Sequence, residues 1–222
     1  MVAAARRLGL FAVPVDDVPS LLAEVAAGHP VVVFQNLGLS WVPRWHYSVV
    51  RGYDLDHQTI VQHSGITADR VTDLNAFERT WARGEYWALV LLPPDVAPAT
   101  GTEQEFLEAA LGLERAQNND GAAKAYETTL RRWSRNFAAW MGLGNTEYAR
   151  DQFQAAALAF EQATQVAPAD PAAWNNLAYA YTALGRKREA VSAAERAVAT
   201  APTAAADAYR DTLREMTALP AA

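Results

Sequence analysis

The chain has 222 residues, of which 51% are hydrophobic and 20% charged, with a formal net charge of −6. This composition is typical of a packed globular protein and excludes a largely disordered chain. Neither half concentrates basic residues, so nucleic acid is not an expected partner. The sequence has no cysteine, which excludes disulfides, thiolate metal ligands and thiol nucleophiles from this chain. The apolar stretches are too short to span a bilayer, so no membrane span is expected.

Residues 1–94 alternate apolar and polar positions with the period of strands, and helical segments interrupt the pattern. The first seven residues are typical of the end of an amphipathic helix. The predicted strands are 9–15, 30–36, 45–54, 59–64 and 85–92, and the predicted helices are 18–27 and 73–83. This part of the chain is therefore expected to be an antiparallel α+β domain, with Trp41, Trp45, Trp81 and Trp87 in its core.

Residues 95–102 are rich in proline, alanine and glycine and are expected to be a linker between two domains. After this segment the period becomes helical to the end of the chain. The predicted helices are 103–117, 119–132, 137–149, 153–166, 171–184, 187–200 and 204–217.

The helical part repeats with a period of 34 residues. Trp140 lies 34 residues before Trp174 and 34 after Phe106, and Ala122, Ala156 and Ala190 share the same offset. The aromatic residues fill the space between the two helices of one unit, and the alanines let the second helix approach closely. Over residues 103–217, three copies in register followed by a helix at 204–217 with a polar outer face resemble tetratricopeptide repeats with a capping helix.

This resemblance implies an all-α superhelix whose first helices form a concave, partner-binding face. Trp140 and Trp174 are expected to belong to the core. The residues of this face make the groove apolar and rich in amides. Lys124 and Lys187, the only lysines of the chain, lie outside it. We therefore expect a protein or peptide ligand without a carboxylate clamp. The residues expected to bind the peptide are Met141, Asn145, Tyr148, Asn175, Tyr179 and Thr182.

The segment Trp45–Asp54 places a histidine at the start of an apolar strand and a glycine near its end, before an acidic hairpin. Residues 59–65 then form a second strand ending in Gln62-His63-Ser64-Gly65. Together with Gly28–Val33 and Phe77–Trp81, these residues resemble the histidine half of the papain-like, bacteriocin-processing (double-glycine) cysteine peptidases. The resemblance covers residues 3–94. The order of the two domains is similar to that of a subgroup in which tetratricopeptide repeats follow the peptidase domain.

The resemblance implies that His46 is the catalytic imidazole and that Gln62 orients it, with Ser64 an alternative in the same motif. His63 would take this position only if the hairpin register placed it on the same face as His46. The family's Cys-Gly-Pro segment is absent, so we expect an N-terminally truncated, non-catalytic domain attached to a binding module. The alternative is a working cysteine peptidase whose nucleophile lies outside this chain, in a bacterial cell envelope or periplasm. No cofactor and no metal site are expected. In particular, we do not expect His46, His57 and His63 to form a zinc site.

Overall fold

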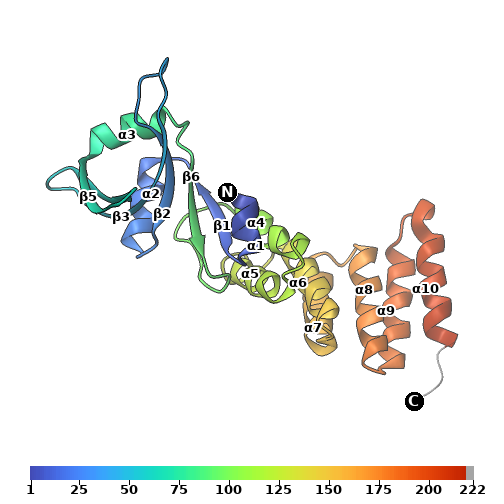
Figure 1. Ribbon diagram of the computed structural model, residues 1–222. Coiled ribbons are helices and arrows are strands. Elements are labelled where there is room, and N and C mark those ends of the chain that lie inside the picture. Colours follow the sequence, from blue (N-terminus) through green and yellow to red (C-terminus); the bar gives the residue numbers. More distant parts are fainter. Residues whose placement is uncertain (219–222) are drawn as a thin grey trace. The chain divides into compact units, whose positions relative to one another are not determined.

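The computed structural model describes residues 1–218. These residues form two compact units, which divide after Ala109 (Figure 1). No helix among the described residues is both long and apolar enough to cross a membrane.

The first unit contains an antiparallel sheet that has six strands within the described residues, in the order β1-β6-β2-β3-β4-β5. Strands β1 and β5 are therefore its two edges. The strands are β1 (Phe11–Val15), β2 (Val31–Asn36), β3 (Trp45–Asp54), β4 (Thr59–Ser64), β5 (Thr67–Asp73) and β6 (Ala88–Leu92). The helices are α1 (Val2–Arg7), α2 (Val18–Ala26) and α3 (Leu74–Ala82).

Strand β5 was not predicted from the sequence, because its side chains are exposed except for a half-buried Thr72. Such a strand has no apolar alternation to reveal it. Strand β6 begins at Ala88 and not at the predicted Glu85, because Glu85 and Tyr86 have φ angles of 58° and 53° and form a turn. The hairpin of β3 and β4 has the predicted bounds.

The two faces of the sheet differ in burial. Val31, Val33, Val50 and Ile60 share one face and are completely buried. The helices α2 and α3 pack against these strands. Trp81 of α3 is also fully buried.

The opposite face carries a cluster of aromatic rings that water reaches. Phe34 and Trp45 stack with ring centroids 5.0 Å apart, and Tyr47 lies 4.6 Å from Phe34. Trp45 is 55% exposed, and Trp41 in the preceding loop is 77% exposed. The prediction that these two tryptophans belong to the core was wrong, because Trp45 lies on an exposed part of this face and Trp41 lies in the exposed loop before β3.

The segment 95–102 is fastened to α2 by a buried carboxylate. Glu24 is fully buried and accepts hydrogen bonds from the backbone N–H groups of Ala99 and Thr100 and from the Thr100 hydroxyl. It also contacts His29 Nδ1 at 2.7 Å. Burial acts to raise the pKa of Glu24, but the hydrogen bonds outweigh it, and the pKa is lowered. These contacts favour a carboxylate that is charged near neutral pH.

The remaining helices follow one another along the chain, and from α5 onwards each packs on the next, as Figure 1 shows for the part coloured yellow to red. The helices are α4 (Glu103–Arg115), α5 (Asn119–Arg132), α6 (Phe137–Ala149), α7 (Phe153–Val166), α8 (Pro171–Ala183), α9 (Lys187–Thr200) and α10 (Ala206–Ala218). A short 3₁₀ turn, Thr203–Ala205, precedes α10. The predicted helical array is confirmed to within about two residues at each helix end.

Side-chain caps explain where several of these helices begin. Asn118, Asn136 and Asp170 each precede a helix and accept a hydrogen bond from a backbone N–H of its first turn. Such caps satisfy donors that have no partner inside the helix. The capping residues therefore fix the starts of α5, α6 and α8.

Glycines in α6 let the neighbouring helices approach. A Cβ atom on Gly142 would lie 2.3 Å from the Tyr126 ring of α5, and one on Gly144 would lie 2.4 Å from the Phe160 ring of α7. Both distances are far below carbon–carbon contact. The two rings therefore occupy the space that side chains at these positions would fill.

Candidate functional site

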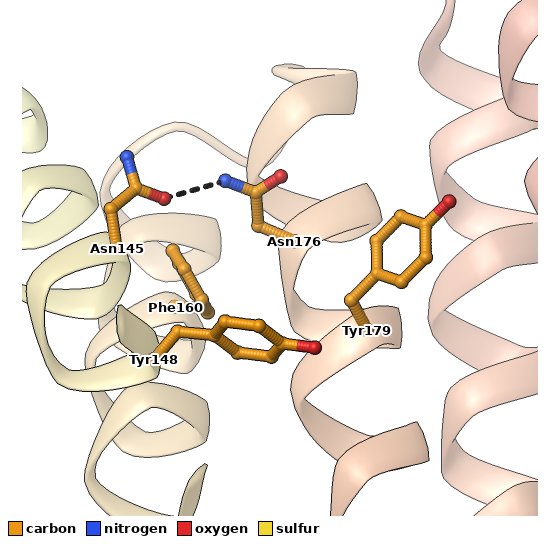
Figure 2. A pocket seen from close by; sticks show the side chains of 5 residues that line it. All are labelled: Asn145, Tyr148, Phe160, Asn176 and Tyr179. Atoms are coloured by element: carbon orange, nitrogen blue, oxygen red, sulfur yellow. Dashed lines mark hydrogen bonds between the residues drawn. The ribbon is translucent and has the colours of Figure 1, made fainter. Parts of the chain in front are cut away.

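A hollow of about 270 Å³ lies between α6, α7 and α8. It is lined by Asn145 and Tyr148 of α6, Phe160 of α7, and Asn176 and Tyr179 of α8 (Figure 2). Asn145 is exposed and Tyr148 is 36% exposed, whereas Phe160 is buried. The hollow thus has an apolar floor beneath tyrosine and amide side chains.

Two amides form a bridge across the hollow. Asn176 Nδ2 donates a hydrogen bond to Asn145 Oδ1 over 3.0 Å. The pairing uses one hydrogen of Asn176 and leaves the Asn145 amino group and the Asn176 carbonyl for a ligand. In Figure 2 these two groups lie on the side of the bridge away from Phe160. The bridge therefore offers one donor and one acceptor, the kinds of group that bind the C=O and N–H groups of a peptide backbone.

The tyrosines are held by neighbouring residues. The Tyr148 ring meets Phe153 edge to face, with centroids 5.2 Å apart. Tyr179 donates through its hydroxyl to Glu215 of α10 over 3.2 Å. The two rings are therefore largely pre-organised walls, which lowers the entropy cost of binding.

Of the predicted peptide-binding residues, the structure brings Asn145, Tyr148 and Tyr179 together. Met141 is instead half-buried against the core cluster around Phe160. Thr182 donates to the Ala178 carbonyl and contacts Met216 Sδ of α10 at 2.6 Å, so the capping helix occupies that end of the groove. These two residues do not line the hollow.

Asn175 also does not line the hollow; its neighbour Asn176 does. Asn175 Oδ1 is buried and has no hydrogen-bond partner within the described residues. The repeat period relates Asn175 to Met141, 34 residues earlier, whereas Asn145 meets Asn176, 31 residues later. Neighbouring first helices therefore face each other through positions that are not equivalent in the repeat. The Asn-x-x-Tyr spacing shared by α6 and α8 was the signal that could have identified Asn176.

The arginine nearest the groove is already engaged. Arg150 donates to both carboxylate oxygens of Glu147, over 2.9 and 2.8 Å, and to Asp120 over 2.7 Å. Burial raises the pKa of Glu147, and Arg150 counteracts this. The Arg150 guanidinium therefore links α6 to the start of α5 and is not a free cation for a ligand carboxylate.

In the first unit, His46 lies on β3 with its ring facing β4. Its Nε2 atom is 2.8 Å from Ser64 Oγ. Gln62, the predicted orienting residue, pairs with Val50, which lies about 13 Å along the strand from His46. The predicted contact of His46 with Gln62 is therefore not formed, and the alternative residue Ser64 takes its place. His63 pairs with Val49 and faces the other side of the sheet.

Gln62 instead belongs to a chain of polar side chains that crosses the sheet. Ser48 Oγ lies 2.8 Å from both Gln35 Oε1 and Gln62 Oε1. The amide nitrogens reach Thr80 Oγ1 at 2.7 Å and Thr72 Oγ1 at 3.2 Å respectively. A hydroxyl has one proton, so Ser48 can donate to only one of the two amide oxygens. Ser48 donates to Gln35 and accepts from Gln62 when the oxygen and nitrogen of the Gln62 amide exchange positions. Thr72 then donates to Gln62, and each hydrogen bond of the chain has one donor and one acceptor.

No group of three or more histidine, aspartate or glutamate side chains that could hold a metal ion occurs in residues 1–218. His57, one of the histidines considered for zinc, contacts Asp54 at 2.7 Å on the exposed hairpin.

Comparison with known proteins identifies the helical array. A sequence profile of the tetratricopeptide repeat family matches residues 107–160 and 143–211. Residues 107–211 are therefore tetratricopeptide repeats, which typically bind proteins. No curated protein sequence matches the chain.

Several solved structures are similar to this chain. The tetratricopeptide-repeat domain of Sgt2 from Aspergillus fumigatus is 20% identical, with a TM-score of 0.49, over 53% of this chain and 78% of that one. The type III secretion translocator chaperone SycD from Yersinia enterocolitica is 15% identical, with a TM-score of 0.48, over 51% of this chain and 82% of that one.

Proposed function

We propose that the repeats bind an extended peptide segment of a partner protein in the groove between α6 and α8. The observation that carries this proposal is the bridge between Asn145 and Asn176, with Tyr148 and Tyr179 beside it and Phe160 below. The amides would bind the peptide backbone, and the rings would hold one apolar side chain of the ligand.

The surrounding charges favour an uncharged segment. Arg150 is bound to two carboxylates, and the Tyr179 hydroxyl is bound to Glu215. A ligand carboxylate would find no free cation among the residues that line the hollow. The hollow is small, so the affinity is expected to be modest, with most of the binding energy at a few residues.

The experiment is selection of a displayed library of random linear peptides on the full chain. We expect enriched peptides with an apolar anchor and no dependence on a free C-terminus. Tyr148→Ala is expected to weaken an enriched peptide about tenfold or more, because truncating a central anchor costs more than about 1 kcal/mol. Asn176→Ala should weaken it similarly by leaving Asn145 without its partner.

Leu158→Ala is the matched control. Leu158 is 53% exposed on α7, does not line the hollow, and its truncation should leave the affinity within twofold. The proposal is wrong if no peptide is enriched, or if enriched peptides bind equally well to Tyr148→Ala and Asn176→Ala with the fold intact.

We also propose that residues 3–94 form a papain-like, peptidase-related domain that is not catalytic in this chain. The observation that favours this is the placement of His46 next to Ser64 on the covered face of an antiparallel sheet. A thiol nucleophile is missing because the sequence has no cysteine. We expect no cleavage of a fluorogenic peptide library. Cleavage that disappears in His46→Ala would refute the non-catalytic part of this proposal.

A further inference from the structure

A second cavity, of about 410 Å³, lies on the sheet of the first unit beside α3. Its floor includes Gln35 and Gln62, which are 1% and 4% exposed. Arg44 and Arg70 also line it, and both are exposed residues. The cavity is separate from the groove between α6 and α8.

The amides of the floor are fixed in place by the chain of hydrogen bonds through Ser48. With the Gln62 amide donating to Ser48, each glutamine uses one amide hydrogen within the chain and keeps a second one. The floor therefore has two hydrogen-bond donors to spare, on side chains that cannot easily turn away.

Both arginines are anchored by the backbone. The Arg44 N–H donates to Asn36 Oδ1 over 2.9 Å, and the Arg44 carbonyl accepts from the Leu37 N–H over 2.9 Å. Arg70 pairs with Gln62 across strands β4 and β5. Neither guanidinium has an ion pair among the described residues, in contrast to Arg51, which lies 3.1 Å from Asp69.

The residues that line the cavity include no carboxylate. Two guanidiniums without an ion pair and two spare amide donors therefore meet at this cavity, and the oxygens of an anion can pair with all of them. A chain with a net charge of −6 has carboxylates in excess, yet none lies at this cavity. The arrangement is therefore complementary to a negatively charged ligand.

We propose that this cavity binds a small molecule through a carboxylate or phosphate group. Arg44 and Arg70 bind the anionic oxygens, and the amides of Gln35 and Gln62 bind an acceptor on the body of the ligand. The volume is within the range of small-molecule sites and too small for a macromolecule to enter.

Ligand-observed NMR on the full chain tests this inference. The probes are a panel of small mono- and dicarboxylates and phosphomonoesters, each measured beside its uncharged amide or alcohol counterpart. We expect at least one anion to bind more than tenfold tighter than its counterpart, and its affinity to fall with added salt. The carboxylate and phosphate arms of the panel identify the anionic group.

Arg44→Gln combined with Arg70→Gln should weaken the selected anion at least tenfold without changing thermal unfolding, because both side chains are exposed. Arg51→Gln removes the same charge on β3 outside the cavity and should change the affinity less than twofold. Binding that survives the double substitution, equal binding of the uncharged counterparts, or no binding by any anion would each overturn the proposal.

Discussion

Replacing Gly144 with alanine tests how α6 and α7 pack and how they shape the peptide groove. The new Cβ atom would lie 2.4, 2.6 and 2.8 Å from three carbons of the Phe160 ring. The ring is 1% exposed and is packed in a buried cluster with Ala156, Leu177 and Ala178. The ring therefore has no empty space to move into except the hollow that it lines.

The expected magnitude is the difference of two effects. Carbon atoms normally approach to about 3.5–4.0 Å, so the ring must shift by about 1 Å. Overpacking of this kind costs about 1–3 kcal/mol. Alanine is better than glycine in a helix by about 1 kcal/mol. We expect a net loss of up to about 2 kcal/mol, and weaker peptide binding because the Phe160 ring moves into the hollow.

Hydrogen exchange of the amides of α6 and α7 measures this loss without assuming that the two units unfold together. Phe160→Leu is expected to destabilise the repeats by itself, because a smaller side chain leaves a cavity. Gly144→Ala should cost less in the Phe160→Leu background than in the wild type. Protection that increases in Gly144→Ala by about the 1 kcal/mol that helix propensity supplies would refute the reasoning.

Two further predictions concern hydrogen bonds to carboxylates. Glu24→Gln should cost about 1–3 kcal/mol at neutral pH, because the Ala99 or Thr100 N–H loses its acceptor. The pKa of Glu24 is lowered, so the stabilisation by its carboxylate is present above the ordinary value of 4.5 and is lost as the pH falls through the folded-state pKa. In urea unfolding, the free energies of unfolding of the wild type and Glu24→Gln should therefore become equal in acid. Burial, together with Glu161, raises the pKa of Tyr181 to about 12. Tyr181→Phe should lower the free energy of unfolding by about 1 kcal/mol. In an alkaline absorbance titration, the variant should lack one tyrosine that ionises at high pH. The difference in stability should persist to pH 10 and shrink towards pH 12.

The sequence predicted the helical array because its packing is local and periodic. Trp140 and Trp174 lie in equivalent positions, and each indole N–H donates to a carbonyl six residues earlier, at Ser134 and Pro168. The groove was predicted less well. Asn176 was missed because facing side chains on α6 and α8 depend on the offset between repeats, which the period alone does not contain.

The first unit was harder to predict because its contacts depend on strand register. The choice between Gln62 and Ser64 as the partner of His46 needed the β3–β4 pairing, which no local pattern determines. The exposure of Trp45 was missed for a related reason. An aromatic residue on a strand is usually half-buried, and the sequence does not reveal which face of the sheet the helices cover.

The two edges of the sheet affect whether the protein aggregates. Exposed strand edges can pair with other chains and start fibrils. The edge strand β1 contains Pro14, which has no N–H to donate to an incoming strand. The edge strand β5 carries Asp69, Arg70 and Asp73, whose charges repel or resist a second copy. We therefore expect that the aromatic rings on the open face, and not the strand edges, will limit how far the protein can be concentrated.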